Sequence, residues 1–270
     1  MTALLLFEQG LNGLQLGVML FLMAAGLTLV FGIMDLIHLS HGSFYMVGAY
    51  LTATFTRQFD SFFVGIALAL PAAALVGMAV EAVAIRRLYA RDHLDQVLAT
   101  FGLILFFNEA VRMIWGSQPI FLTPPPALAG TIEIVPGMPY PAFRLAILGV
   151  GVAVALFLLA LIRHTRLGML VRAGASNRAM AGALGIDTDR LFTLVFGLGA
   201  ALAALAGGMA GPVLAVQVGM GESILILTFV VVVIGGIGSI KGALVGALLV
   251  GLVDTLARTA LPALLRALMG

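Results

Sequence analysis

The sequence contains no cysteine and few charged residues. Without a thiol, disulfide bonds and thiolate metal ligands are excluded, and the redox compartment stays undetermined. Only 10% of the 270 residues are charged and 62% are hydrophobic, whereas about a quarter are charged in a soluble domain. One globular core does not hide so much apolar surface, because a domain of this size leaves much of its surface exposed. We therefore expect much of the surface of this chain to face lipid.

The small amount of charge also excludes several functions. The formal net charge is only +2 and the basic residues lie in short loops, which does not favour nucleic-acid binding. No Gly-x-x-x-x-Gly-Lys-Ser/Thr motif occurs, so the chain has no P-loop for ATP phosphates. The four histidines lack carboxylate partners at metal-ligand spacing, and no serine lies in a nucleophile elbow. We expect no metal site, no cofactor bound by this chain and no enzymatic activity.

Long apolar runs dominate the rest of the sequence. A helix that spans a bilayer needs roughly 20 mostly apolar residues. Seven runs meet or approach this length, and a shorter run follows a polar break at residues 35–41. The pattern predicts an all-α integral membrane protein, a polytopic bundle of about eight transmembrane helices that forms a single domain over residues 1–270. The predicted spans are residues 11–33, 43–56, 62–85, 94–114, 143–162, 191–211, 222–240 and 242–262.

Two segments between these runs are not apolar. Residues 115–142 hold seven of the ten prolines and the single tryptophan, whereas residues 163–190 hold five arginines. Basic residues in short loops favour the cytoplasm. We therefore expect 163–190 inside, and the proline-rich segment and both chain ends outside.

The 33 glycines are expected to hold the bundle together. Little hydrophobic force acts between helices in lipid, so small residues four positions apart allow backbones to approach closely. Glycines with this spacing are Gly13 and Gly17, Gly207 and Gly211, and Gly238, Gly242 and Gly246.

Three acidic residues inside the apolar runs have basic neighbours. Glu109 precedes Arg112 by three positions and Asp254 precedes Arg258 by four, which favours ion pairs along one helix face. Glu81 lies just before two arginines and has the same interpretation. Because charge in the bilayer is costly, we expect local pairs rather than a proton path.

The basic segment 163–190 contains a short amphipathic pattern. Ser176 is expected to cap a helix that Gly185 ends, and Asp187 is expected to cap the next helix. A helix this short is unstable alone, so its apolar ridge needs a partner, which is another protein, the bundle itself or the lipid surface. The ridge consists of Met180, Ala183 and Leu184, with Asn177 on the same stripe.

Three stretches resemble the permease subunits of bacterial ABC importers for branched-chain amino acids. They are residues 26–50 (GLTLVFGIMDLIHLSHGSFYMVGAY), residues 179–190 (AMAGALGIDTDR) and residues 235–243 (GGIGSIKGA). The three lie in order and span nearly the whole chain. One departure is His38, where many members carry asparagine.

The resemblance implies a type II ABC importer-like fold in the cell inner membrane. It implies an assembly of this chain with a second permease subunit, two ABC ATPase subunits that bind ATP and Mg, and a periplasmic amino-acid-binding protein. The expected cargo is leucine, isoleucine or valine, although members that carry urea, short amides or other amino acids share the architecture. A cytoplasmic coupling helix would dock in a groove of the ATPase. The residues expected to couple this chain to the ATPase are Arg172, Asn177, Arg178, Met180, Ala181, Leu184 and Gly185.

Polar residues inside helices are expected to face an interior cavity, and they are therefore candidates for the cargo path. Hydrogen bonding between helices is the alternative role for each of them. A rival function, a stand-alone ion-coupled transporter or channel, needs an unpaired acid such as Asp254 without Arg258. A membrane scaffold without transport activity is the third possibility. The candidate path residues are Asn12, Gln15, Ser40, His41 and Tyr45.

Overall fold

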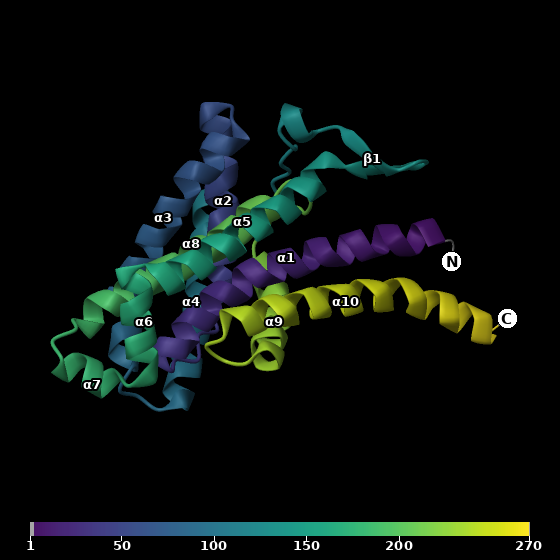
Figure 1. Cartoon of the computed structure of the whole chain (residues 1–270). Coiled ribbons are helices and arrows are strands. Elements are labelled where there is room, and N and C mark those ends of the chain that lie inside the picture. The colour runs from purple at the N-terminus through teal and green to yellow at the C-terminus, as the bar shows by residue number, and fades with distance from the viewer. Residues whose placement is uncertain (1–2, 270) are drawn as a thin grey trace.

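The structure is a computed structural model that describes the backbone of residues 3–269 and the side chains of residues 4–259. Within that range each of the eight predicted spans is a helix, and the helices pack into one bundle (Figure 1). The long helices are α1 (Ala3–Met34), α2 (His41–Phe59), α3 (Phe62–Val83), α4 (His93–Trp115), α5 (Ala142–His164), α8 (Thr188–Ala210), α9 (Met220–Gly235) and α10 (Ile240–Met269). The short ones are η1 (Ile85–Leu88), η2 (Pro126–Leu128), α6 (Arg166–Ser176) and α7 (Arg178–Ala183).

Six of the described helices are long and apolar enough to cross a membrane, namely α1, α3, α4, α5, α8 and α10. Helix α9 is also apolar but has only 16 residues, which makes it about 24 Å long. Helix α2 has 19 residues and carries more polar side chains. The bundle is therefore built from six full spans and two helices that depend on their neighbours.

Helices α1 and α8 form the centre of the bundle. In α1, 83% of the most apolar window is buried within the chain, and in α8 the share is 78%, whereas α3, α4 and α5 each bury 22%. Helix α1 packs along α10, and α8 packs against α2 and α3. A central helix has no polar face, which explains why α1 is apolar all round.

The connection from α1 to α2 runs through the protein interior. Its backbone N–H groups need partners there, because no water is present in the bilayer core. The side chains of α4 provide them: the Ile37 N–H donates to Gln96 Oε1 at 3.2 Å, and the Leu39 N–H donates to Thr100 Oγ1 at 3.3 Å. These two hydrogen bonds therefore hold the polar segment 35–41 against α4.

The proline-rich segment contains a feature that the all-α prediction misses. Strands β1 (Thr131–Val135) and β2 (Met138–Pro141) form an antiparallel hairpin that turns at Gly137, whose φ is +84°. The turn is closed by the Gly137 N–H, which donates to Glu133 Oε1 at 2.6 Å. Alternation over so few residues is a weak signal beside the prolines, so the hairpin was not predictable from the pattern.

The two non-apolar segments lie at opposite ends of the bundle. Figure 1 shows α6 and α7 at one end, and the hairpin with the start of α1 and the end of α10 at the other. This arrangement agrees with the predicted sidedness, in which the arginine-rich segment faces the cytoplasm.

Close backbone contacts occur at the predicted glycines. An ideal Cβ on Gly17 would lie 2.9 Å from the backbone of Leu248 in α10, and one on Gly207 would collide with the Tyr45 carbonyl oxygen in α2. By contrast, a Cβ on Gly102 in α4 would meet nothing within 4 Å. The spacing of small residues therefore predicted real helix contacts, as packing in lipid requires.

Substitution of Gly207 tests this packing. We expect Gly207→Ala to lower the thermal unfolding midpoint in detergent by roughly 3 to 10 °C, because overpacking costs about 1–3 kcal/mol. The matched control is Gly102→Ala, which should leave the midpoint unchanged or raise it, since alanine favours helix more than glycine. Equal midpoints for the two variants would contradict the close contact of α8 with α2.

Candidate functional site

Helix α7 is a short helix with a well-formed cap at each end. The Asn177 side chain accepts a hydrogen bond from the Met180 N–H at 2.9 Å. The predicted cap Ser176 is wrong, because α6 continues through Ser176 and the chain becomes extended only at Asn177. At the other end Gly185 has φ +85°, and the Ile186 N–H donates to the Ala181 carbonyl at 3.1 Å. Gly185 therefore ends the helix, as predicted.

The two faces of α7 differ. Met180 and Leu184 are 57% and 76% exposed, so the predicted apolar ridge faces away from the bundle. Ala181 is 4% exposed and packs against the chain itself, so it can contribute to coupling only by seating the helix. Exposed large apolar side chains of this kind mark a surface that contacts either another protein or the membrane.

Arg178 links α7 to the bundle. Its guanidinium carbon lies 4.5 Å from the ring centroid of Phe192 in α8 and 5.3 Å from that of Tyr89. A guanidinium over an aromatic face is attracted by the ring quadrupole. The predicted coupling residue Arg178 thus faces this chain, and Arg172 donates to the Ile162 carbonyl oxygen in α5.

Glu81 is the buried centre of a polar network that lies next to α7. Its side chain is fully buried and accepts hydrogen bonds from Arg86 Nη2 at 2.9 Å, Thr193 Oγ1 at 2.7 Å and the Tyr89 hydroxyl at 3.0 Å. Burial, together with the charge of Glu81, raises the pKa of Tyr89, which keeps the hydroxyl protonated as a donor. The network joins α3, η1 and α8, and Tyr89 connects it to Arg178.

Sequence reasoning predicted only a local ion pair at Glu81. The Arg86 pair exists, but the contact with Thr193 is 112 positions away in the sequence. A signal was present in α3, because Glu81 continues a stripe of small residues spaced four apart that all face inward. That stripe consists of Gly65, Ala69, Ala73 and Gly77.

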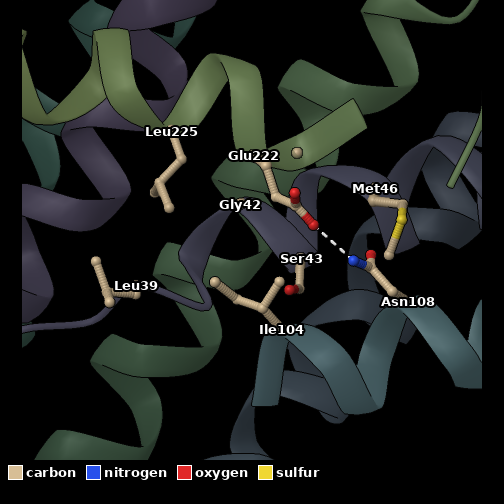
Figure 2. Close-up of a pocket in the computed structure, with 9 residues that line it drawn as sticks. Leu39, Gly42, Ser43, Met46, Ile104, Asn108, Glu222 and Leu225 are labelled. Atoms are coloured by element: carbon tan, nitrogen blue, oxygen red, sulfur yellow. Dashed lines mark hydrogen bonds between the residues drawn. The ribbon is translucent and has the colours of Figure 1, made fainter. Parts of the chain in front are cut away.

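A second polar site lies within the membrane part of the bundle (Figure 2). Asn108 in α4 donates to Glu222 Oε1 in α9 at 2.5 Å, and Ser43 in α2 lines the same cavity. Apolar side chains, including Ile104, form the remaining walls. The cavity has about 10 Å³ of free volume, which is about enough for one water molecule.

Glu222 has no cation within ion-pair distance in the part of the chain that the structure describes. It is exposed on the surface of this chain, and Asn108 lies about 22 Å along α4 from His93. An ionisable group at membrane depth is costly against lipid and therefore indicates a functional contact. Sequence reasoning missed Glu222, because it stands at the edge of a predicted span and its partner is distant in the sequence.

Comparison with known proteins identifies the family of the chain. A family model described as "Branched-chain amino acid transport system / permease component" matches residues 10–270. The chain is 31% identical to the high-affinity branched-chain amino acid transport system permease protein LivH of Escherichia coli, over 92% of this chain and 85% of LivH. It is 32% identical to the corresponding protein BraD of Pseudomonas aeruginosa, over 92% of this chain and 84% of BraD. The chain belongs to this permease family.

The membership confirms the resemblance found in the sequence and places the permease in the inner membrane as a multi-pass protein. The helical bundle agrees with the predicted fold class, apart from the hairpin. No solved structure matches this permease.

The predicted path residues of the permease fall into two groups. Ser40, His41 and Tyr45 lie together at the start of α2 and are at most 1% exposed. Asn12 and Gln15 lie about 12 Å or more further along α1, since Met23 and Gly26 are α1 residues next to His41. The path role of all five stays a prediction.

Asn12 has a clear structural role beside that prediction. It accepts hydrogen bonds from the Tyr140 hydroxyl at 3.0 Å and from Arg144 Nη1 at 2.5 Å. It therefore ties α1 to the hairpin and to α5, which is the interhelical role considered as the alternative.

The two predicted helical ion pairs of the permease are present. Arg258 Nε lies 2.8 Å from Asp254 Oδ2, and Arg112 Nη1 lies 3.4 Å from Glu109 Oε2. The ion-coupled rival needed an unpaired acid such as Asp254, and Asp254 itself is paired with Arg258.

We expect Glu81→Gln to lower the thermal midpoint of the permease by several degrees, because the arginine, tyrosine and threonine donors lose the charge of their buried carboxylate acceptor. The matched control is Glu109→Gln, which should shift the midpoint by no more than about 1 to 2 °C, since exposed pairs contribute little. The midpoints of the two variants are measured by fluorescence-monitored unfolding in detergent. A shift for Glu81→Gln as small as that of the control would show that the network does not stabilise the bundle.

Proposed function

We propose that this permease is one of two transmembrane subunits of an ATP-driven importer for branched-chain amino acids. The observation that carries the proposal is α7, a capped helix at the predicted cytoplasmic end whose apolar ridge has no cover within the described chain. The printed names of LivH and BraD, which are branched-chain amino acid permease proteins, support leucine, isoleucine or valine as cargo. Urea, short amides or other amino acids are the alternative cargo.

In this proposal the permease has no enzymatic activity of its own. Two ABC ATPase subunits bind ATP and Mg, a second permease subunit completes the pore, and a periplasmic binding protein delivers the cargo. The hairpin end of the bundle, with residues 115–142, receives the loaded binding protein. The arginine-rich end, with residues 163–190, receives the ATPases.

Coupling follows from the position of α7. ATP binding closes the ATPase dimer, and the groove that holds Met180 and Leu184 pulls the helix. Arg178 passes the motion to Phe192 and Tyr89, which it stacks on. Since Tyr89 bonds Glu81, α3 and α8 move together with α7, and the bundle switches its access from outside to inside.

The cargo path is proposed along the face that carries Glu222, Asn108 and Ser43. A branched-chain amino acid has an ammonium group, a carboxylate and an apolar side chain. Glu222 offers a carboxylate to the ammonium group, and the apolar residues beside it would contact the side chain once a second subunit encloses the space that the 10 Å³ cavity of one chain lacks. The predicted residues Ser40, His41 and Tyr45 lie on the same helix as Ser43 and support that face from within the bundle.

Purification of the tagged permease from its native membrane in mild detergent tests the assembly. We expect two P-loop ATPases and a second permease to accompany it. Leu184→Arg places a charge in the apolar groove, so it should remove the ATPases and abolish uptake while the second permease remains bound. Leu184→Met keeps the ridge apolar and should behave as the parent protein. Normal uptake by Leu184→Arg would contradict the docking role of α7.

The path is tested by the charge of Glu222. We expect Glu222→Gln to reduce the maximal uptake rate by roughly tenfold or more, because an interaction with a charged partner contributes about 1.5–3 kcal/mol. Uptake is measured in proteoliposomes with the loaded binding protein, with equal amounts of assembled complex. Glu109→Gln removes an acid from α4 and should transport normally. A Glu222→Gln complex that assembles and transports at the parent rate would exclude Glu222 from the path.

A further inference from the structure

A cavity of about 210 Å³ lies at the predicted cytoplasmic end, between α1, α5, α6 and the connection from α9 to α10. Three basic side chains stand around it, one each from α5, α6 and α10. Its walls are otherwise mostly apolar. The basic residues are Arg163, Arg172 and Lys241, and the apolar wall includes Leu29, Ile33, Leu158, Leu159 and Ile162.

The three cations gather there without a carboxylate. Within the described residues none of them lies within ion-pair distance of an acidic side chain. Arg172 is held in place because it donates to the Ile162 carbonyl oxygen, also at the cavity. Three like charges around one apolar hollow repel one another, so the arrangement favours an anion between them.

A second cavity adjoins the first and shares three of its lining residues. This second cavity has about 320 Å³ of free volume and lies between α1, α5 and α10. Leu159, Ile240 and Lys241 line both cavities, and Lys241 is the charged residue of the second. The remaining wall of the second cavity is apolar and consists of Phe21, Ala155, Leu244 and Val245.

We propose that this double cavity binds an anionic phospholipid. The phosphate lies among Arg163, Arg172 and Lys241, and one acyl chain runs along α5 and α10 into the second cavity. Basic pockets between membrane helices on the cytoplasmic side are suited to anionic headgroups. A free phosphate ion would satisfy the charges but would leave the apolar cavity without a ligand, so an apolar cavity that shares Lys241 with the basic one favours a lipid.

The lipid would have a structural effect on the coupling segment. Arg172 belongs to α6, and α6 is followed by α7 after the single residue Asn177. A phosphate bound by Arg172 therefore fixes α6 between α5 and α10. Helix α7 then moves against a fixed support, and the anionic lipid content of the membrane influences coupling.

Native mass spectrometry of the delipidated permease tests the site. Phosphatidylglycerol and phosphatidylcholine with identical acyl chains are added back in competition, and inorganic phosphate is added alone in a third arm. We expect one phosphatidylglycerol to be retained in preference to phosphatidylcholine. The double variant Arg163→Gln/Lys241→Gln should reduce this preference by roughly tenfold or more, since each basic residue contributes about a fivefold factor near an anionic lipid.

Two further variants separate the headgroup from the acyl chain. Arg57→Gln/Arg87→Gln removes the same charge outside both cavities and should keep the preference. Val245→Trp fills the apolar cavity and should weaken retention of both lipids without a change in charge. Equal retention of the two lipids by the parent protein, or a preference that survives Arg163→Gln/Lys241→Gln, would overturn the proposal. Displacement of the lipid by inorganic phosphate would also overturn the proposal. The measurement needs no ATPase or uptake, so its outcome is independent of the proposed importer function.

Discussion

Helices in a bilayer gain little from the hydrophobic effect, because lipid is as apolar as their side chains. Close contact at small residues is then the attraction on which this bundle depends. Gly48 in α2 lies against Ala204 in α8, and Gly77 in α3 lies against Ala200 of the same helix. Helix α8 therefore packs closely against α2 on one side and against α3 on another. Helices α2, α3 and α8 are thus closely packed as one body.

Under the proposed function, this body is what the six-residue helix α7 would act on. Helix α7 is too short to be stable by itself, and its caps only fix its ends. Besides the buried Ala181, it contacts the rest of the chain through Arg178, which stacks on Phe192 of α8 and on Tyr89. Tyr89 is in turn bonded to Glu81 of α3. A buried carboxylate with several donors has few alternative arrangements, because each lost donor costs free energy. The joint between α7 and the body is thus stiff, whereas the outer ridge stays free for a partner.

The features that were predictable from the sequence depend on residues that lie close together in the chain. Run length predicted the spans, Gly185 and Asp187 predicted the end of α7 and the start of α8, and spacing predicted the Asp254–Arg258 pair. Features that depend on distant partners were missed. The hydrogen bond from Asn108 to Glu222 joins residues 114 positions apart. The residue pattern of neither helix predicts it. The N-cap of α7 is Asn177 rather than Ser176, because α6 continues through Ser176, and cap preference alone does not distinguish two neighbouring residues that can both act as caps.

The short helix α9 also limits where a path can form. At about 24 Å it does not cross the bilayer core of about 30 Å, and it begins where Gly221 meets Gly42 at the start of α2. Two helix starts therefore meet inside the bundle, beside the Asn108–Glu222 pair. The cavity at this point holds about 10 Å³, far less than an amino acid needs. Glu222 nevertheless faces outward from this chain, where lipid would make its charge costly. A second permease subunit that covers α4 and α9 would remove that cost and enclose the space that one chain lacks, which would place the proposed path at the interface between two subunits.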